Sequence, residues 1–487
     1  MLFNSFVFAV FLPLVFFLYW FVTHKNLRLQ NFMLLVASCT FYGWWDWKFL
    51  GLVFVSAFID YFAGIGIQDT EDPRRRKLLL VLSMSSNLGI LGFFKYFNFF
   101  VDSFVQAFAG VGIPLEASTL NIILPVGISF YTFQSMSYTI DIYKRELEPT
   151  RNPIDFAAFV MFFPQLVAGP IERAANLLPQ FYVHKKFDLA LAQDGIRQVF
   201  WGLFKKIVIA DTCAHAVNTI FDHSETMSGS ALLLGALLFT FQIYGDFSGY
   251  SDIAIGIARL FGFELMQNFN MPYLSRDIGE FWRRWHISLS TWFRDYVYIP
   301  LGGSRVSKWK QIRNVMIVFT VSGFWHGANW TFIFWGFLNG LYQIPIVLRK
   351  NRRPATKVVA EGRLFPTPRE VFQLATTFAA TVLAWIFFRA ESIGQAFSII
   401  GEIFSPSLLS NPAASLGGFD LRDTVAYSFI AIAVLMTIEW LQRGKKHGLE
   451  LSGGLPVMRW AAYFAMVAVI ILFRRTGGNL DFIYFQF

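Results

Sequence analysis

Apolar blocks of about twenty residues run through the whole sequence and restrict the chain to a helical membrane fold. A helix needs about 20 apolar residues to cross a hydrocarbon layer of about 30 Å, and it pairs its own backbone groups there. Only 15% of the residues are charged, whereas soluble domains carry about 25%. We therefore predict an all-α, polytopic membrane protein with spans near 5–22, 31–47, 49–67, 78–98, 122–143, 199–221, 230–258, 314–333, 334–348, 371–389, 424–442 and 456–473.

About 11 to 12 transmembrane helices are expected, and two further segments mix apolar residues with prolines, glycines or arginines. Residues 155–170 and 263–305 are predicted to be re-entrant or interfacial pieces, with a cytoplasmic funnel beneath the second. We expect one integral-membrane domain over 1–487, made of N-terminal helices (1–150), a catalytic core (about 190–350) and C-terminal helices (371–487).

The net charge of +9 fits a membrane protein better than a nucleic-acid-binding protein. Basic residues gather in cytoplasmic loops of membrane proteins, and here they follow the ends of predicted spans. The run Arg74–Lys77 after the third span is expected to be cytoplasmic, which places the N-terminus outside. No nucleic-acid partner is expected.

Residues 244–252 (Tyr-Gly-Asp-Phe-Ser-Gly-Tyr-Ser-Asp) place an ionisable group inside a predicted span. A carboxylate at membrane depth is costly, so Asp246 is a candidate functional residue that could orient a catalytic group. The alternative is a structural Asp, paired with a neighbouring base or hydroxyl to hold helices together. The sequence leaves both roles open.

Residues 281–295 combine aromatic, basic and hydroxyl side chains. Read as one helix, this run puts Trp285, Leu289 and Trp292 on a common face. Composition alone favours an interfacial amphipathic helix. The second hypothesis is an anion site for a nucleotide-containing donor, whose candidate ligands are Arg276, Arg283, Arg284 and Arg294.

His326 lies in the apolar segment 322–330 and is expected in the middle of a span. A buried, neutral imidazole can take a proton from an attacking hydroxyl and return it later. A packing histidine is the alternative. The flanking Gly323 and Gly327 leave one helix face open, either for a substrate or for a close helix.

Several other site types are disfavoured. Cys39 and Cys213 lie far apart in apolar segments and indicate neither a disulfide framework nor a thiol metal site. The sequence has no closely spaced metal-ligand cluster, phosphate loop or Gly-x-Ser-x-Gly elbow. We expect no bound metal and no tightly held cofactor.

Taken in order, these segments resemble the membrane-bound O-acyltransferase family, and most closely its branch with the membrane subunit of alginate O-acetyltransferase. The segments that carry the resemblance are 124–130, 163–171, 245–252, 269–273, 280–290, 298–303 and 325–329. Each motif is moderately specific alone; together in this order they are specific and cover most of the chain.

The resemblance implies a fold and a set of roles. The fold would be a ring of tilted helices around a pore that narrows at a catalytic histidine, matched here by His326. His286 matches the second functional position. Ser290 and Asn329, from the same motifs, become candidates for orienting groups or polar pore residues.

The same resemblance implies a function. An acetyl thioester, expected to be acetyl-CoA, would enter from the cytoplasm of a bacterial inner membrane. Its acetyl group would pass to an extracytoplasmic partner, an acetyltransferase or esterase-like protein, and on to an exopolysaccharide such as alginate or cellulose. The alternatives are D-alanyl or another acyl transfer to teichoic acid, peptidoglycan, lipid or protein, and a non-enzymatic transporter.

Overall fold

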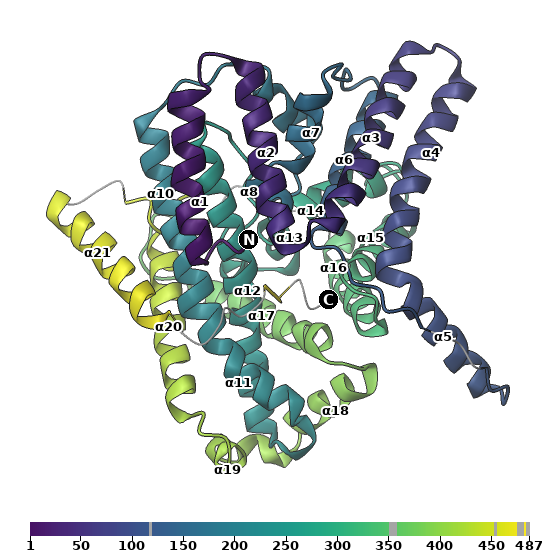
Figure 1. The fold of residues 1–487 in the computed structure, drawn as a ribbon. Helices are drawn as coiled ribbons and strands as arrows, with labels where there is room; N and C mark the ends of the chain where they lie inside the picture. Colours follow the sequence, from purple (N-terminus) through teal and green to yellow (C-terminus); the bar gives the residue numbers. More distant parts are fainter. Residues whose placement is uncertain (116–118, 350–357, 452–454, 475–481, 484–487) are drawn as a thin grey trace. The chain divides into compact units, whose positions relative to one another are not determined.

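The computed structural model describes residues 1–115, 119–349, 358–451, 455–474 and 482–483, and it has no strand among them. Helices make up most of the described residues (Figure 1), and the chain divides into two compact units. The first comprises residues 1–195 and 254–266, and the second comprises 196–253 and 267–487. Helices α10 (Leu189–Leu203) and α12 (Gly229–Leu260) each contribute residues to both units.

The described residues of the first unit form helices, and α4, η2 and α5 follow one another without a break. Its helices α3 and α4 are tied by a buried polar cluster, in which Ser83 and Asn87 donate hydrogen bonds to the Asp60 carboxylate. The helices of this unit are α1 (Phe6–Phe17), η1 (Leu18–Val22), α2 (Leu27–Asp46), α3 (Lys48–Asp69), α4 (Pro73–Leu91), η2 (Gly92–Tyr96), α5 (Phe97–Gly110), α6 (Ile128–Tyr143), α7 (Pro153–Met161), α8 (Phe163–Leu166), α9 (Ala174–Leu177) and η3 (Leu178–Phe181).

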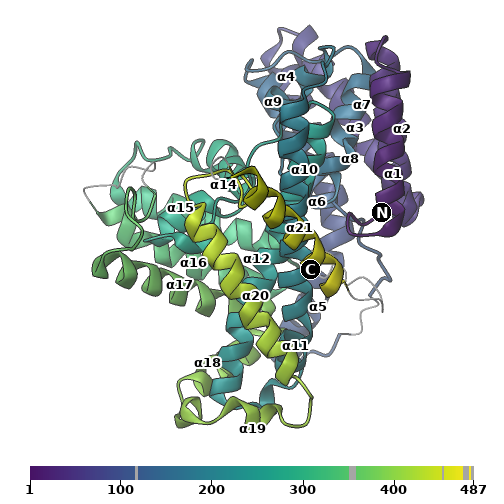
Figure 2. The ribbon, with the colours of Figure 1, turned by 90° about the vertical axis from the view of Figure 1, so that its left-hand side faces the viewer.

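The second unit holds the predicted catalytic segments. Figure 2 shows α15, α16 and α17 as neighbours, which agrees with their tertiary contacts. Its elements are η4 (Phe204–Ala210), α11 (Asp211–Asp222), η5 (Ser224–Thr226), η6 (Pro272–Leu274), α13 (Ile278–Arg284), α14 (Ile287–Phe293), η7 (Arg294–Tyr298), α15 (Lys308–His326), α16 (Trp330–Leu348), α17 (Pro368–Arg389), α18 (Ile393–Ile403), η8 (Pro406–Leu409), α19 (Pro412–Leu416), α20 (Arg422–Leu441) and α21 (Pro456–Phe473).

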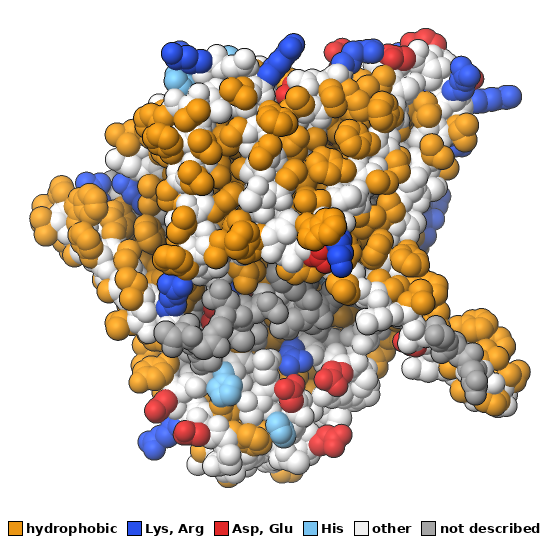
Figure 3. Space-filling model, in the orientation of Figure 1, with side chains coloured by type: hydrophobic (Ala, Val, Ile, Leu, Met, Phe, Trp, Pro, Cys, Tyr) orange, Lys and Arg blue, Asp and Glu red, His pale blue; other side chains and the backbone are white. Residues whose placement is uncertain are grey.

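Large apolar side chains remain exposed on the helices of the first unit. On α1 and η1, Phe6, Leu14 and Phe21 are each more than half exposed. In Figure 3, apolar side chains cover this face and Lys and Arg gather at its upper rim. Such a contiguous apolar surface is unfavourable in water and is expected where a helix faces lipid.

Among the described residues, seven helices are long and apolar enough to cross a membrane. They are Lys48–Asp69, Pro73–Gly110, Gly229–Leu260, Trp330–Leu348, Pro368–Arg389, Arg422–Leu441 and Pro456–Phe473. The protein is therefore a multi-pass, all-α membrane protein, as predicted. The larger expected number of spans counts further segments, such as Phe6–Val22, and stays a prediction.

Several predicted span boundaries differ from those of the structure. The 314–333 helix ends at His326, and α16 starts at Trp330 instead of residue 334. Gly327 adopts an extended backbone there, and the Asn329 side chain accepts a hydrogen bond from the Thr331 N–H to begin the next helix. The 122–143 segment becomes helical only at Ile128, after Gly127 in a left-handed conformation (φ 75°).

Candidate active site

His286 lies at a break between two short helices. Asp277 caps α13 by accepting a hydrogen bond from the Glu280 N–H (2.9 Å), and α13 ends at Arg284. His286 then takes a left-handed backbone conformation (φ 42°) and α14 starts at Ile287. The expectation of one helix over 281–295 was therefore wrong. A non-glycine residue at positive φ is uncommon and requires support from its surroundings.

That support comes from Asn268, a fully buried residue on the preceding loop. Its backbone carbonyl accepts a hydrogen bond from the Ile287 N–H at 2.9 Å. Its side-chain Oδ1 lies 3.1 Å from His286 Nδ1 and 2.8 Å from Ser288 Oγ. Sequence reasoning missed Asn268, which directly precedes the motif 269–273; that position was the signal in the sequence.

The imidazole of His286 is enclosed by rings. It meets Phe247 of α12 edge to face, with ring centroids 4.7 Å apart, and it lies 6.3 Å from the nearly parallel ring of Phe269. Burial lowers the pKa of His286 to about 3. The ring is therefore neutral at physiological pH.

His326 is the last residue of α15, not a mid-span residue as expected, and it is 3% exposed. Its ring contacts Trp335 of α16 and Phe388 of α17, with centroids 5.1 and 5.5 Å away. The centroid of the His286 ring lies 6.2 Å from that of His326. The fold thus brings together the two histidines that the sequence singled out.

The glycines near His326 serve helix packing. A Cβ atom on Gly323 would collide with the Phe332 carbonyl oxygen and with the backbone of Gly336. A Cβ atom on Gly327 would overlap the Phe332 ring. Of the two roles that the sequence left open, the structure assigns these positions to a close helix, because α15 and α16 meet at backbone distance.

Asp246 takes part in a buried ion-pair cluster. Its carboxylate lies 2.7 Å from Lys206 Nζ, and Lys206 also pairs with Asp211 at 2.8 Å. The second oxygen of Asp246 accepts a hydrogen bond from the Ile483 N–H at 2.5 Å. These contacts supply the structural role that the sequence offered as an alternative; an orienting role toward a histidine stays a prediction.

Lys205, the residue before Lys206, forms a second buried ion pair with α12, through Asp252. Its Nζ lies 2.5 Å from Asp252 and 2.9 Å from the Ser248 hydroxyl. The π-helical η4 directs both lysines toward α12. The adjacent lysines inside an apolar run were a signal of buried ion pairs that sequence reasoning missed.

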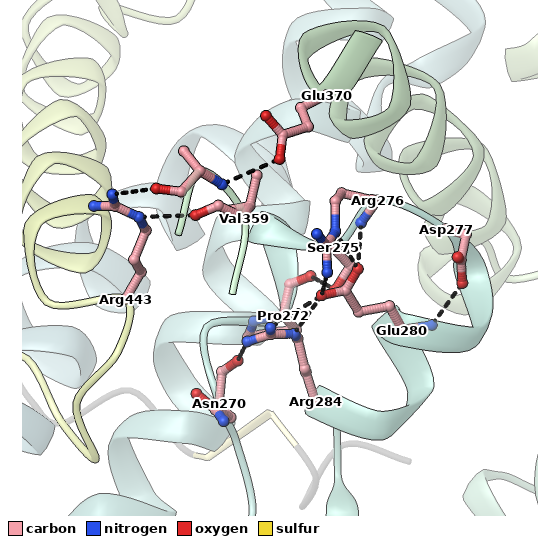
Figure 4. A network of polar contacts seen from close by, with 11 residues as sticks. Asn270, Pro272, Ser275, Arg276, Asp277, Glu280, Arg284, Val359, Glu370 and Arg443 are labelled. Atoms are coloured by element: carbon pink, nitrogen blue, oxygen red, sulfur yellow. Dashed lines mark hydrogen bonds and ion pairs between the residues drawn. The ribbon is translucent and has the colours of Figure 1, made fainter. Parts of the chain in front are cut away.

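The four candidate donor-binding arginines fall into two groups. Arg276 and Arg284 both bind Glu280, at 2.9 and 3.0 Å (Figure 4). Burial alone would raise the pKa of Glu280, but its hydrogen bonds from Arg276 and the charge of Arg284 hold that pKa below its usual value. Arg283 and Arg294 line a cavity, and Arg294 also pairs with Asp295 at 2.7 Å.

This cavity has a volume of about 610 Å³ and is walled by α13, α14, α15 and α16. Arg349 and Arg369 also line it, so four arginines border a largely apolar chamber. Ser290 and Ser322 line the same cavity, and Ser322 precedes His326 by one helical turn. Trp282 forms another wall, and its ring packs against Trp335, which in turn contacts His326.

The remaining candidate, Asn329, caps α16 and donates a hydrogen bond to the Glu391 carbonyl oxygen (3.0 Å). Its observed contacts are those of a helix cap. The residues that the structure describes contain no group of three His, Cys, Asp or Glu side chains arranged to hold a metal ion.

Comparison with known proteins gives consistent matches. The model of the membrane-bound O-acyltransferase family matches residues 144–359. A probable alginate O-acetylase of Azotobacter vinelandii is 43% identical over 83% of this chain and 78% of its own length. One from Pseudomonas putida is 42% identical over the full length of both chains. A peptidoglycan O-acetyltransferase of Helicobacter pylori is 38% identical over 100% of this chain and 98% of its own.

Proposed function

The chain belongs to the membrane-bound O-acyltransferase family and is an O-acyltransferase, and from this premise we propose that it transfers acetyl from a cytoplasmic thioester to an extracytoplasmic acceptor. The donor in this proposal is acetyl-CoA, and the membrane is a bacterial inner membrane. The acceptor is an exopolysaccharide of the alginate type, reached through an extracytoplasmic acetyltransferase or esterase-like partner.

The observation that carries the proposal is the convergence of His286 and His326 beside an arginine-bordered cavity. Their ring centroids are 6.2 Å apart, and Ser322 of the cavity wall lies one turn before His326. Guanidinium groups bind phosphates through paired, charge-assisted hydrogen bonds. Arg283 and Arg294 therefore suit the phosphates of a nucleotide-containing donor, while the apolar walls suit its thioester arm.

In the proposed reaction, His326 acts as the general base. It takes the proton of the acceptor hydroxyl, and the oxygen keeps the bonding electron pair and attacks the thioester carbonyl carbon. The carbon–sulfur bond then breaks with its electron pair passing to sulfur, and the imidazolium returns the proton to the thiolate. His286 acts on the donor, either by orienting it or by stabilising charge on the thioester oxygen.

A second candidate keeps the chemistry and changes the acceptor to peptidoglycan. It is favoured by the full-length match to the peptidoglycan O-acetyltransferase of Helicobacter pylori. Both acceptors present sugar hydroxyls, so the same pair of histidines serves either one. Fractionation of the labelled product separates the two candidates.

The test is transfer from radiolabelled acetyl-CoA in membranes that contain the intact chain, His326→Ala, His215→Ala or no chain. His215 is an exposed histidine of α11 and serves as the matched control. We expect label in polymer or protein with the intact chain and with His215→Ala, and a loss of about 10²–10⁴-fold with His326→Ala. Near-normal transfer by folded His326→Ala would overturn the assignment. Unlabelled CoA should compete with the donor; without competition, a carrier-protein donor is favoured.

A further inference from the structure

Asn268 is the centre of a buried hydrogen-bond network that joins three segments. Its amide group contacts Ser251 of α12 at 3.0 Å and Ser288 of α14, and it also lies beside the ring of His286. Asn268 itself is on the loop that follows α12 and is fully buried. The orientation of its amide therefore decides which hydrogen bonds the His286 ring can make.

The backbone of Ser288 fixes that orientation. The Ser288 N–H can only donate, and it points at the Asn268 side chain with the N and O atoms 3.3 Å apart. The atom that it meets must accept, so it is the carbonyl oxygen Oδ1 and not the amide nitrogen. The NH₂ group is then on the side of Ser251, whose hydroxyl oxygen accepts one of its hydrogens.

The same oxygen lies 3.1 Å from His286 Nδ1. An acceptor-only atom at that distance requires a hydrogen on Nδ1. The Ser288 hydroxyl also lies 3.4 Å from Nδ1, but its one hydrogen goes to Asn268 Oδ1 at 2.8 Å. The Ser288 hydroxyl oxygen can therefore only accept a hydrogen bond from Nδ1, and this contact also requires a hydrogen on Nδ1.

We propose that Asn268 is a positioning residue that keeps the proton of His286 on Nδ1, so that Nε2 of the neutral ring presents a lone pair. This inference rests on the proposed function and narrows it. A neutral His286 in this tautomer accepts a hydrogen bond at Nε2, for example from an amide N–H or a hydroxyl of the donor. It has no hydrogen there to give to the thioester oxygen. Two roles were proposed for His286, and this tautomer is compatible with orienting the donor but not with donating a hydrogen bond to the thioester oxygen.

Burial favours the neutral form, and the charged side chains named on the neighbouring elements are held in ion pairs. The titratable ring facing His286 is His326 of α15. On α12, Asp246 immediately precedes Phe247 in the sequence, and its carboxylate pairs with Lys206. On α13, Arg284 pairs with Glu280. Since Asn268 is uncharged, its oxygen orients the imidazole without pulling a second proton onto it, as a carboxylate would.

The direct test measures the tautomer. The ¹⁵N chemical shifts of histidine-labelled protein distinguish a protonated from an unprotonated ring nitrogen, and the spectrum of His286→Gln identifies the His286 signals. We expect a protonated Nδ1 and an unprotonated Nε2 in the wild-type protein and in Ser288→Ala, which keeps the Asn268 contact. A protonated Nε2 in the wild type overturns the proposal. This readout needs no activity, so it stands apart from a failure of the proposed function, which would appear as no transfer by the wild type.

Two variants test the consequence for the reaction. Asn268→Leu removes the acceptor, and we expect a loss of transfer on the order of 10–100-fold at every pH, by analogy with the loss of a partner that orients a metal-ligating histidine. Asn268→Asp keeps an acceptor but adds charge, so protonation of His286 becomes easier. Its activity should be low in acid and recover toward the wild-type rate as pH rises.

The control for an added carboxylate is Asn218→Asp, on α11 and beside Arg389, which should keep the wild-type pH profile. If Asn268→Leu transfers at the wild-type rate, or if the Asn268→Asp profile superimposes on that of the wild type, the positioning role is excluded. If Asn268→Leu does not fold, the comparison of Asn268→Asp with the wild type decides, because Asp preserves the shape and the acceptor.

Discussion

Lys206 and Asp246 form an ion pair of 2.7 Å, and both side chains are more than nine-tenths buried. Breaking a buried pair strands a charge and costs about 3–5 kcal/mol. We expect Asp246→Ala to lose about 3 kcal/mol, the lower end of that range, because Asp211 still holds Lys206. Thermal unfolding in detergent measures this. The exposed Asp423→Ala is the control, and a stable Asp246→Ala with transfer reduced more than 100-fold would assign Asp246 to the chemistry instead.

The contact between α15 and α16 gives a second prediction. Gly323→Leu places a side chain against the backbone of Phe332 and Gly336, which cannot move aside as a flexible side chain would. Overpacking of this kind typically costs about 1–3 kcal/mol, and it should also displace His326 and reduce transfer. Gly401→Leu on α18 is the control, because a Cβ atom there meets nothing within 4 Å. Equal behaviour of the two variants would contradict the close packing.

Adjacent arginines should have separable effects. Arg283 lines the cavity, so Arg283→Ala should raise the KM for acetyl-CoA by at least about tenfold, which corresponds to the loss of one charged hydrogen bond. Arg284 binds Glu280 and the Asn270 carbonyl, so Arg284→Ala should lower the Tm. Initial rates at varied acetyl-CoA and thermal unfolding test both. An unchanged KM in Arg283→Ala would remove that residue from the donor site.

Glu280 should make stability depend on pH. Its pKa in the folded protein is lowered, so its ionised form stabilises the fold above the ordinary glutamate pKa of about 4.3. That stabilisation should be lost as pH falls through the lowered pKa. Glu280→Gln should be less stable at neutral pH and should lose less stability on acidification than the wild type. The measurement is the Tm as a function of pH, from neutral pH down through the lowered pKa of Glu280. A Glu225→Gln variant, at an exposed position, is the control. Parallel curves of Tm against pH for Glu280→Gln and the wild type would refute the prediction.

Local patterns were sufficient to predict most helices and to single out His326 as a candidate, whereas His286 became a candidate only through the family resemblance. Apolar runs such as 456–473 became helices with the expected bounds, because their length and composition are local properties. The start of α16 could also have been predicted from the sequence. Asn329 stands directly before an apolar run, which is the position of a helix N-cap. Its boundary was missed because the aromatic and apolar residues on both sides of His326–Asn329 were assigned to one span.

The break at His286 could not be predicted in the same way. It depends on Asn268, eighteen residues earlier in the sequence, whose carbonyl holds the Ile287 N–H. Periodicity reports which residues share a helix face and carries no information on such a contact. The ion pairs of Arg276 and Arg284 with Glu280 could not be predicted either, because the sequence spacing allows those pairs without showing that they form.

The left-handed backbone at His286 also restricts which amino acids that position can hold. At φ 42°, β-branched side chains are strongly disfavoured, while glycine, asparagine, aspartate and histidine are tolerated. Backbone geometry alone thus limits the amino acids that position 286 can hold, before the chemistry of the side chain is considered. Of the residues that remain, asparagine alone pairs an uncharged side chain with an acceptor oxygen, so it is the natural replacement for an imidazole whose task is to accept a hydrogen bond. The turn at His286, between the seven-residue helices α13 and α14, therefore restricts which substitutions evolution can accept at this position. This restriction does not depend on the substrate.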